Sequence, residues 1–141
     1  MRATASPTPV PPLDPLCWSA PVAAVAQTWA NTCTWAHNPG RGFLGENLWA
    51  IGYTGSTPPG NPPLDAVSDW ASEAADYDYA TNTCSGVCGH YTQIVWRSTQ
   101  DVGCGIKHCT GGSPCGPSFP NWTIVVCDYD PPGNFVGQRP Y

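Results

Sequence analysis

Eight cysteines in a chain of 141 residues constrain this sequence more than any other feature. Their number is even, and they occur with 15 glycines, 17 prolines and few charged residues. This combination is typical of secreted proteins in which disulfides stabilise a small fold. We therefore expect a secreted, disulfide-stabilised protein. Eight cysteines allow about 100 pairings, so the sequence alone does not choose among them.

Some of these cysteines could instead be metal ligands. Cys84, Cys88 and His90, followed by Cys104 and Cys109, have spacings that could be drawn as a zinc site. They are embedded in strand-like sequence rather than in a zinc knuckle. The disulfide framework is therefore the better interpretation, and structural zinc bound through cysteine is the alternative.

Charge and hydropathy exclude several classes of partner. Five basic residues stand against ten acidic ones, the net charge is −5, and the basic residues are not clustered. Nucleic acid and anionic membranes are therefore poor partners. No apolar run approaches the roughly 18 residues of a membrane-spanning helix. At this length we expect one domain with its own core, present as a monomer.

The first part of the chain differs in composition from the rest. The stretch MRATASPTPVPPLDPL is rich in proline and threonine and lacks periodicity, which predicts an irregular lead segment over residues 1–16 and a domain over 17–141. Within this domain, apolar residues at helical spacing predict a helix that is capped by Ser19 and ends near the HNPG stretch at 37–40. A second helix is expected after a cap at Asp65.

Strand patterns dominate the second half of the chain. Alternation predicts a strand at 91–96. Two further strands are expected at 102–108 and 122–129, which flank a loop rich in glycine, proline and serine and are expected to pair as a hairpin. Because helices come first and strands follow, the sequence predicts an α+β domain with an antiparallel sheet. The sequon Asn-Trp-Thr at Asn121 is a candidate glycosylation site.

Four ionisable side chains lie at the ends or flanks of these expected elements: His37, Glu46, Glu73 and His90. Histidine and glutamate are residue types that bind metal ions or transfer protons. Each residue also has a structural interpretation, such as a helix-end histidine that interacts with the helix dipole. Spacing along the chain does not show whether the four converge.

Four stretches carry a family resemblance: GHYTQIVWRSTQDVGCG, CDYDPPGNFVGQRPY, HNPGRGFLGENLW and DWASEAADYDYATNTC. Through these motifs the chain, from about Leu13 to Tyr141, resembles the CAP superfamily (SCP domain) of cysteine-rich secretory proteins, antigen 5 and plant pathogenesis-related proteins. The resemblance implies an α-β-α sandwich, with helices on both faces of a central antiparallel sheet.

The same resemblance implies roles for the four ionisable residues. It places them in one central cleft, where His37 and His90 would bind a divalent metal, most often zinc, weakly and reversibly. Glu46 and Glu73 would bond to the imidazoles or to a metal-bound water.

Disulfide pairs are also implied by matching positions to the family. They are Cys33 with Cys109, Cys84 with Cys88, and Cys104 with Cys127. Cys17 and Cys115 are left over, and we expect them to pair by elimination.

The function implied is that of a secreted, non-catalytic binding or effector module related to defence or virulence, with a protein or a lipid as its partner. Family members bind sterols or other lipids, and Trp49 and Tyr53 could line such a groove here, unless they are simply core. Two alternatives stay open. One is a metal-dependent peptidase or esterase with a glutamate as general base. The other is a precursor that releases the C-terminal signalling peptide PPGNFVGQRPY.

The chain departs from the family pattern at three places. We expect the usual first helix with its His-Asn-x-x-Arg signature to be missing or reduced, with Arg2 as its remnant, which puts a lipid cavity walled by that helix in doubt. Asn38 stands where many plant members have serine. The stretch CDYD stands where the plant form has CNYD, so that Asp128 replaces an asparagine.

Overall fold

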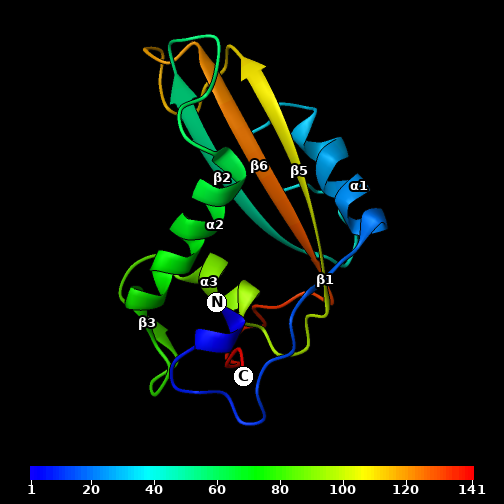
Figure 1. Cartoon of the computed structure of the whole chain (residues 1–141), viewed down its shortest axis with the longest axis vertical. Coiled ribbons are helices and arrows are strands. Elements are labelled where there is room, and N and C mark those ends of the chain that lie inside the picture. The colour runs from blue at the N-terminus through cyan, green and yellow to red at the C-terminus, as the bar shows by residue number, and fades with distance from the viewer.

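The computed structural model describes all residues from 1 to 141. Figure 1 shows a long central sheet with helix α1 on one face and helices α2 and α3 on the other. The elements in chain order are η1 (Arg2–Thr4), β1 (Cys17–Trp18), α1 (Ala20–Ala30), β2 (Gly45–Tyr53), α2 (Pro62–Ser72), η2 (Glu73–Asp76), β3 (Tyr77–Asp78), β4 (Thr83–Cys84), α3 (Gly89–Ile94), β5 (Asp101–Thr110) and β6 (Asn121–Asp130). None of the helices has the length and apolar character to cross a membrane.

The central sheet has the strand order β1-β5-β6-β2. Strands β5 and β6 form the predicted hairpin, and β2 pairs antiparallel with β6 along its other edge. The two-residue strand β1 adds a short parallel pairing to β5. The expected α-β-α sandwich is therefore confirmed, although the sequence analysis did not predict β2.

Side chains of β6 alternate between two cores. Trp122, Ile124 and Val126 pack toward α1, whereas Val125 and Tyr129 pack toward α2 and α3. This alternation follows from the pleat of a strand that is buried on both faces. The central strand therefore holds both helical layers together.

Helix α1 confirms the first predicted helix, but it ends at Ala30 and not near residues 37–40. It lies very close to β5, because a Cβ atom at Gly103 would come within 2.0 Å of the Ala23 nitrogen. Gly105 allows the same close approach one pleat further along, against Gln27. Glycine in a strand often marks such an approach of another backbone.

The second predicted helix begins earlier than expected. Helix α2 starts at Pro62 with Asn61 as its N-cap residue, so the expected cap at Asp65 is wrong. Proline is well suited to the first helical turn because its missing N–H needs no partner there. Asp65 still stabilises this end, since its carboxylate accepts a hydrogen bond from the Asn61 backbone N–H at 2.8 Å.

The predicted strand at 91–96 is wrong. Residues 89–94 form the short helix α3, and its four residues from Tyr91 to Ile94 are all buried. Four consecutive residues cover all sides of a helix, so a helix in which all four are buried has no apolar face with a period of 3.6 residues. The alternation in this stretch therefore suggested a strand. This error matters because His90 lies in this helix.

The lead segment at 1–16 is irregular apart from η1, and it packs against α3. Ala5 and Leu13 share a small core with Tyr91. The Arg2 guanidinium donates hydrogen bonds to the carbonyls of Ile94 and Trp96 at 3.0 and 2.8 Å. The bond to Ile94 satisfies a carbonyl at the end of α3, whereas the Trp96 carbonyl also accepts the Thr99 backbone N–H at 3.1 Å.

Three of the four expected disulfides are present: Cys33–Cys109, Cys84–Cys88 and Cys104–Cys127. The fourth is wrong, because Cys17 and Cys115 are both free. Cys17 pairs in register with Asp101 at the start of β5, whereas Cys115 lies in the loop beyond its end. A ten-residue strand spans roughly 30 Å, and disulfide Cα atoms lie within about 7 Å of each other.

Candidate functional site

The first histidine–glutamate pair joins the segment after α1 to strand β2. The ring Nδ1 of His37 lies 2.7 Å from Glu46 Oε1, which also accepts the backbone N–H of Asn38 at 2.9 Å. The Glu46 side chain is 0% exposed, whereas that of His37 is 58% exposed. A buried carboxylate therefore makes Nδ1 the donor and leaves Nε2 of His37 on the solvent side.

The second histidine–glutamate pair, His90 and Glu73, is arranged in the same way. The ring Nδ1 of His90, in α3, lies 2.6 Å from Oε1 of Glu73, which follows α2. The other oxygen of Glu73 accepts the backbone N–H groups of His90 and Tyr91 at 3.0 and 3.1 Å. The His90 ring also stacks on Trp70, with ring centroids 5.9 Å apart. Glu73 thus fixes both the start of α3 and the ring orientation of His90.

Strand β2 connects the two pairs. Asn47, the residue after Glu46, donates a hydrogen bond from its amide to the carbonyl of His90 at 3.1 Å. The structure therefore brings each histidine to its glutamate and links the two pairs through one buried amide. No three histidine, cysteine or acidic side chains lie close enough together to hold a metal ion.

A cleft of about 400 Å³ opens beside the first pair. His37 and Glu46 line it, whereas His90 and Glu73 are not among its lining residues. Arg41 adds a positive group to the lining. The family resemblance places all four residues in one cleft, whereas this cleft is lined by only one of the two pairs, His37 and Glu46.

Aromatic side chains and the C-terminal tail form the other part of this cleft. Phe43 and Phe135 are exposed at its rim, with ring centroids 6.4 Å apart. The buried side chain of Gln93 holds the part of the tail that lines the cleft, because its Oε1 accepts a hydrogen bond from the Gly133 N–H at 2.9 Å. Gly45 makes room for Gln93, since a Cβ there would lie 2.2 Å from the same oxygen. The sequence analysis missed these residues, although a strand glycine beside Glu46 signals a close approach.

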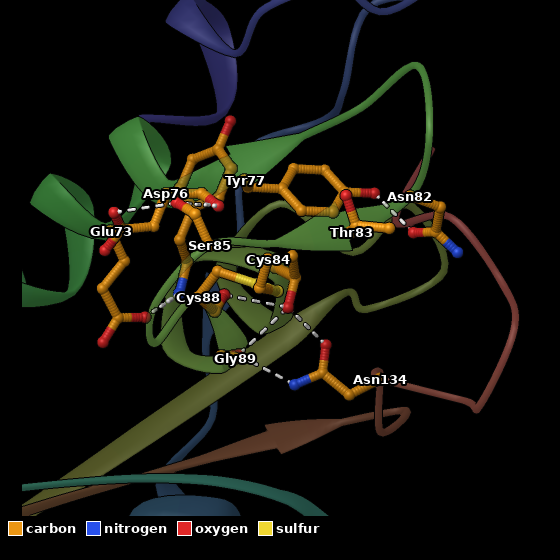
Figure 2. The surroundings of a disulfide bond; sticks show 12 residues. Glu73, Asp76, Tyr77, Asn82, Thr83, Cys84, Ser85, Cys88, Gly89 and Asn134 are labelled. Carbon is orange, nitrogen blue, oxygen red and sulfur yellow. Dashed lines mark hydrogen bonds between the residues drawn. A yellow bond between two sulfur atoms is a disulfide. The ribbon is translucent and has the colours of Figure 1, made fainter.

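Figure 2 shows how the Cys84–Cys88 disulfide precedes α3. Cys88 is the N-cap residue of α3, two positions before His90. Asn134 of the tail holds the same turn, because its amide donates to the Gly89 carbonyl at 2.8 Å and its oxygen accepts the Thr92 hydroxyl at 2.7 Å. The disulfide and the tail together therefore constrain the turn that presents His90.

The predicted lipid-groove residues Trp49 and Tyr53 have packing roles. Trp49 donates its indole N–H to the Asp69 carboxylate of α2 at 2.6 Å and packs against the core under that helix. Tyr53 is buried. The most apolar groove lies elsewhere, between α2 and β5, with a volume of about 300 Å³.

The sequon at Asn121 begins strand β6. The Asn121 amide donates a hydrogen bond to the Gly55 carbonyl at 2.8 Å. Thr123, which carries the hydroxyl that the sequon requires, is completely buried. Glycosylation at this position would therefore have to precede folding.

A further acidic residue faces the first pair from within the sheet. Asp128 of β6 is the register partner of Glu46 and is 0% exposed. Burial and then the charge of Glu46 raise the pKa of Asp128 to about 7. The sequence analysis noted the unusual CDYD stretch but gave Asp128 no role.

These observations define a class of protein, a disulfide-stabilised α-β-α sandwich with two histidines that are each oriented by a glutamate. One of these histidines lines a cleft, and the C-terminal tail forms a wall of that cleft. The sequence model of the cysteine-rich secretory protein family (CAP) matches residues 9–129. The chain belongs to this family.

Known proteins agree with this assignment. The chain is 42% identical over 133 residues to pathogenesis-related protein 1 of Arabidopsis thaliana, covering 92% of this chain and 72% of the relative. It is 41% identical over 142 residues to peptidase inhibitor 16 of Mus musculus, covering 99% of this chain. It spans only 27% of the length of that inhibitor. A solved structure of NaASP2 with Zn2+ superimposes with a TM-score of 0.69 at 25% identity, covering 92% of this chain and 66% of that one.

Proposed function

We propose that this chain is a secreted, non-catalytic binding or effector module with a weak divalent-metal site, suited to zinc, at His37 and His90. The observation that carries the proposal is the matching orientation of the two rings by Glu46 and Glu73. The assigned role in defence or virulence rests on family membership. Hydrolysis by the same four residues stays a prediction.

Zinc suits the donor groups of this site. A carboxylate that accepts Nδ1–H fixes the ring tautomer and raises the basicity of Nε2, an arrangement common around zinc-binding histidines. Two neutral imidazoles without a third protein ligand should bind the ion weakly, because structural sites have four protein ligands and catalytic sites three. The bound ion would offer open positions to water or to a partner's carboxylate. The NaASP2 structure with Zn2+ supports this reading in a protein of the same fold.

Titration calorimetry with Zn2+ tests the site. We expect His37→Ala and His90→Ala to abolish measurable binding, and Glu46→Gln and Glu73→Gln to weaken it about 10- to 100-fold because the rings lose their orientation. His108→Ala is the matched control, since this ring bonds Thr123 on the sheet at 2.7 Å. The proposal fails if wild type does not bind zinc, or if His108→Ala weakens binding as much as the other two alanine variants.

A second candidate function, lipid binding, is favoured by the apolar groove between α2 and β5. Trp18 is 64% exposed beside this groove, and Pro63, Val67 and Ile106 line it with Trp18. Grouped exposed apolar side chains commonly mark a binding surface. We therefore propose this groove, rather than the surroundings of Trp49 and Tyr53, as the sterol or lipid site.

Binding of a fluorescent sterol tests the groove. Val67→Asp should weaken binding at least about tenfold, because the ligand would desolvate a carboxylate without a partner. Val136→Asp places the same charge on the exposed tail and should leave binding unchanged. Equal affinity of wild type and Val67→Asp would remove this groove as the lipid site.

A further inference from the structure

Asp128 and Glu46 form a buried carboxyl pair near one end of the central sheet. They face each other across β6 and β2, and both side chains are shielded from solvent. Both oxygens of Asp128 and Oε2 of Glu46 lack any hydrogen-bond partner among the other residues. Such an arrangement is unstable for two carboxylates, because buried charges need a hydrogen bond or a counter-ion.

No basic side chain forms an ion pair with Asp128. The two histidine–glutamate contacts are the only ion pairs, and helix α1 carries no titratable side chain. The charge of Arg41 lowers the pKa of Asp128, but burial and the charge of Glu46 outweigh it, and the guanidinium itself donates to the carbonyls of Leu44 and Asn38. On the neighbouring strand β5, Asp128 is paired with Gly103, which has no side chain and therefore supplies neither a charge nor a side-chain hydrogen bond. The next acidic pair along the sheet, Asp101 and Asp130, would add repulsion only.

The surroundings of the two carboxyl groups decide which one holds a proton. Glu46 already accepts hydrogen bonds from His37 and Asn38, and these favour its ionised form. Asp128 accepts none. Burial and the adjacent negative charge therefore favour the protonated form of Asp128, in agreement with its raised pKa.

We propose that Asp128 holds a proton in the folded protein and donates it to Oε2 of Glu46, which makes Asp128 a positioning residue for the Glu46–His37 pair. His37, Glu46 and Asp128 then form one hydrogen-bonded chain that runs from the cleft into the sheet. The inference does not require a bound metal.

Loss of this proton has a structural consequence. Two adjacent carboxylates would repel, and Glu46 would move away from His37 or carry strain. The wall of the cleft at His37 is therefore tightest in mildly acidic medium and loosens above neutral pH. An asparagine, which the plant form of the motif has here, could donate the same hydrogen bond but could not release a proton in this range.

Carbon-13 NMR of the carboxyl groups tests the assignment directly. We expect one carboxyl to titrate near pH 7 in wild type and in the control Asp130→Asn, and to be missing from Asp128→Asn. In Glu46→Gln its midpoint should fall, because the neighbouring charge is removed. The proposal is overturned if every carboxyl of the wild type titrates in the ordinary range of about 4.

Thermal unfolding tests the consequence for stability. The pKa of Asp128 is raised from 3.8 to about 7, so the folded state binds more protons than the unfolded state between these values. The contribution of Asp128 to the free energy of unfolding is therefore complete below pH 3.8, falls as the pH rises to about 7, and stays constant above that pH. Between pH 5 and pH 8, the unfolding midpoint of wild type should drop by roughly 8 °C more than that of Asp128→Asn. Parallel curves for the two proteins would contradict the proposal.

Discussion

Replacing Cys33 and Cys109 with alanine should lower the free energy of unfolding by about 4 kcal/mol. The disulfide joins residues separated by 76 positions, so its loss frees a long loop in the unfolded chain. It also ties the segment that follows α1 to strand β5, next to the core around Trp122. At roughly 4 °C per kcal/mol, the midpoint of thermal unfolding should fall by about 15 °C. Differential scanning calorimetry measures both quantities.

The Cys84–Cys88 disulfide provides the matched control. Its cysteines are separated by 4 positions, so the same loop-entropy argument gives about 2 kcal/mol for the Cys84→Ala, Cys88→Ala variant. The difference between the two double variants tests the dependence on loop length and does not depend on their absolute values. Equal losses in both variants would show that local packing, and not chain entropy, determines what these bridges contribute.

The sequence predicted those parts of the fold that have an apolar face at helical spacing or an apolar run next to a turn signal. Helix α1 is of the first kind, and the β5–β6 hairpin, whose strands flank a loop rich in glycine, proline and serine, is of the second. Strand β2 was missed, since its GENLWAIGY sequence contains two glycines and a buried carboxylate. That glutamate is accommodated by His37 and Asn38, which only the tertiary structure places beside it.

Only part of the candidate site could be predicted from the sequence. Residue types and family resemblance identified His37, Glu46, Glu73 and His90, but spacing does not determine which histidine meets which glutamate. The structure pairs His37 with Glu46, nine residues apart, and His90 with Glu73, seventeen residues apart. Asp128 was beyond sequence reasoning because its importance depends on the register between β6 and β2.

The C-terminal tail, residues 131–141, bears on the proposal that this segment is released as a signalling peptide. Gly133 bonds to Gln93, and Asn134 bonds to the first turn of α3. Arg139 donates to the carbonyls of Tyr79 and Ala80 at 2.9 and 2.7 Å. The tail is therefore a wall of the cleft beside His37, and its removal would also free the turn of α3 that presents His90.

A chain that ends at Asp130 should lose about 4 kcal/mol of stability. Its truncation leaves the buried Gln93 oxygen without a donor, which costs about 2 kcal/mol, and uncovers Trp96, on which Gly133 and Phe135 pack, at a similar cost. Chemical denaturation of the truncated and full-length chains measures the difference. Arg139→Ala is the control and should cost about 1 kcal/mol, because its hydrogen bonds lie at the surface. A truncated chain that is as stable as the full-length protein would instead favour a tail that can be released without loss of the fold.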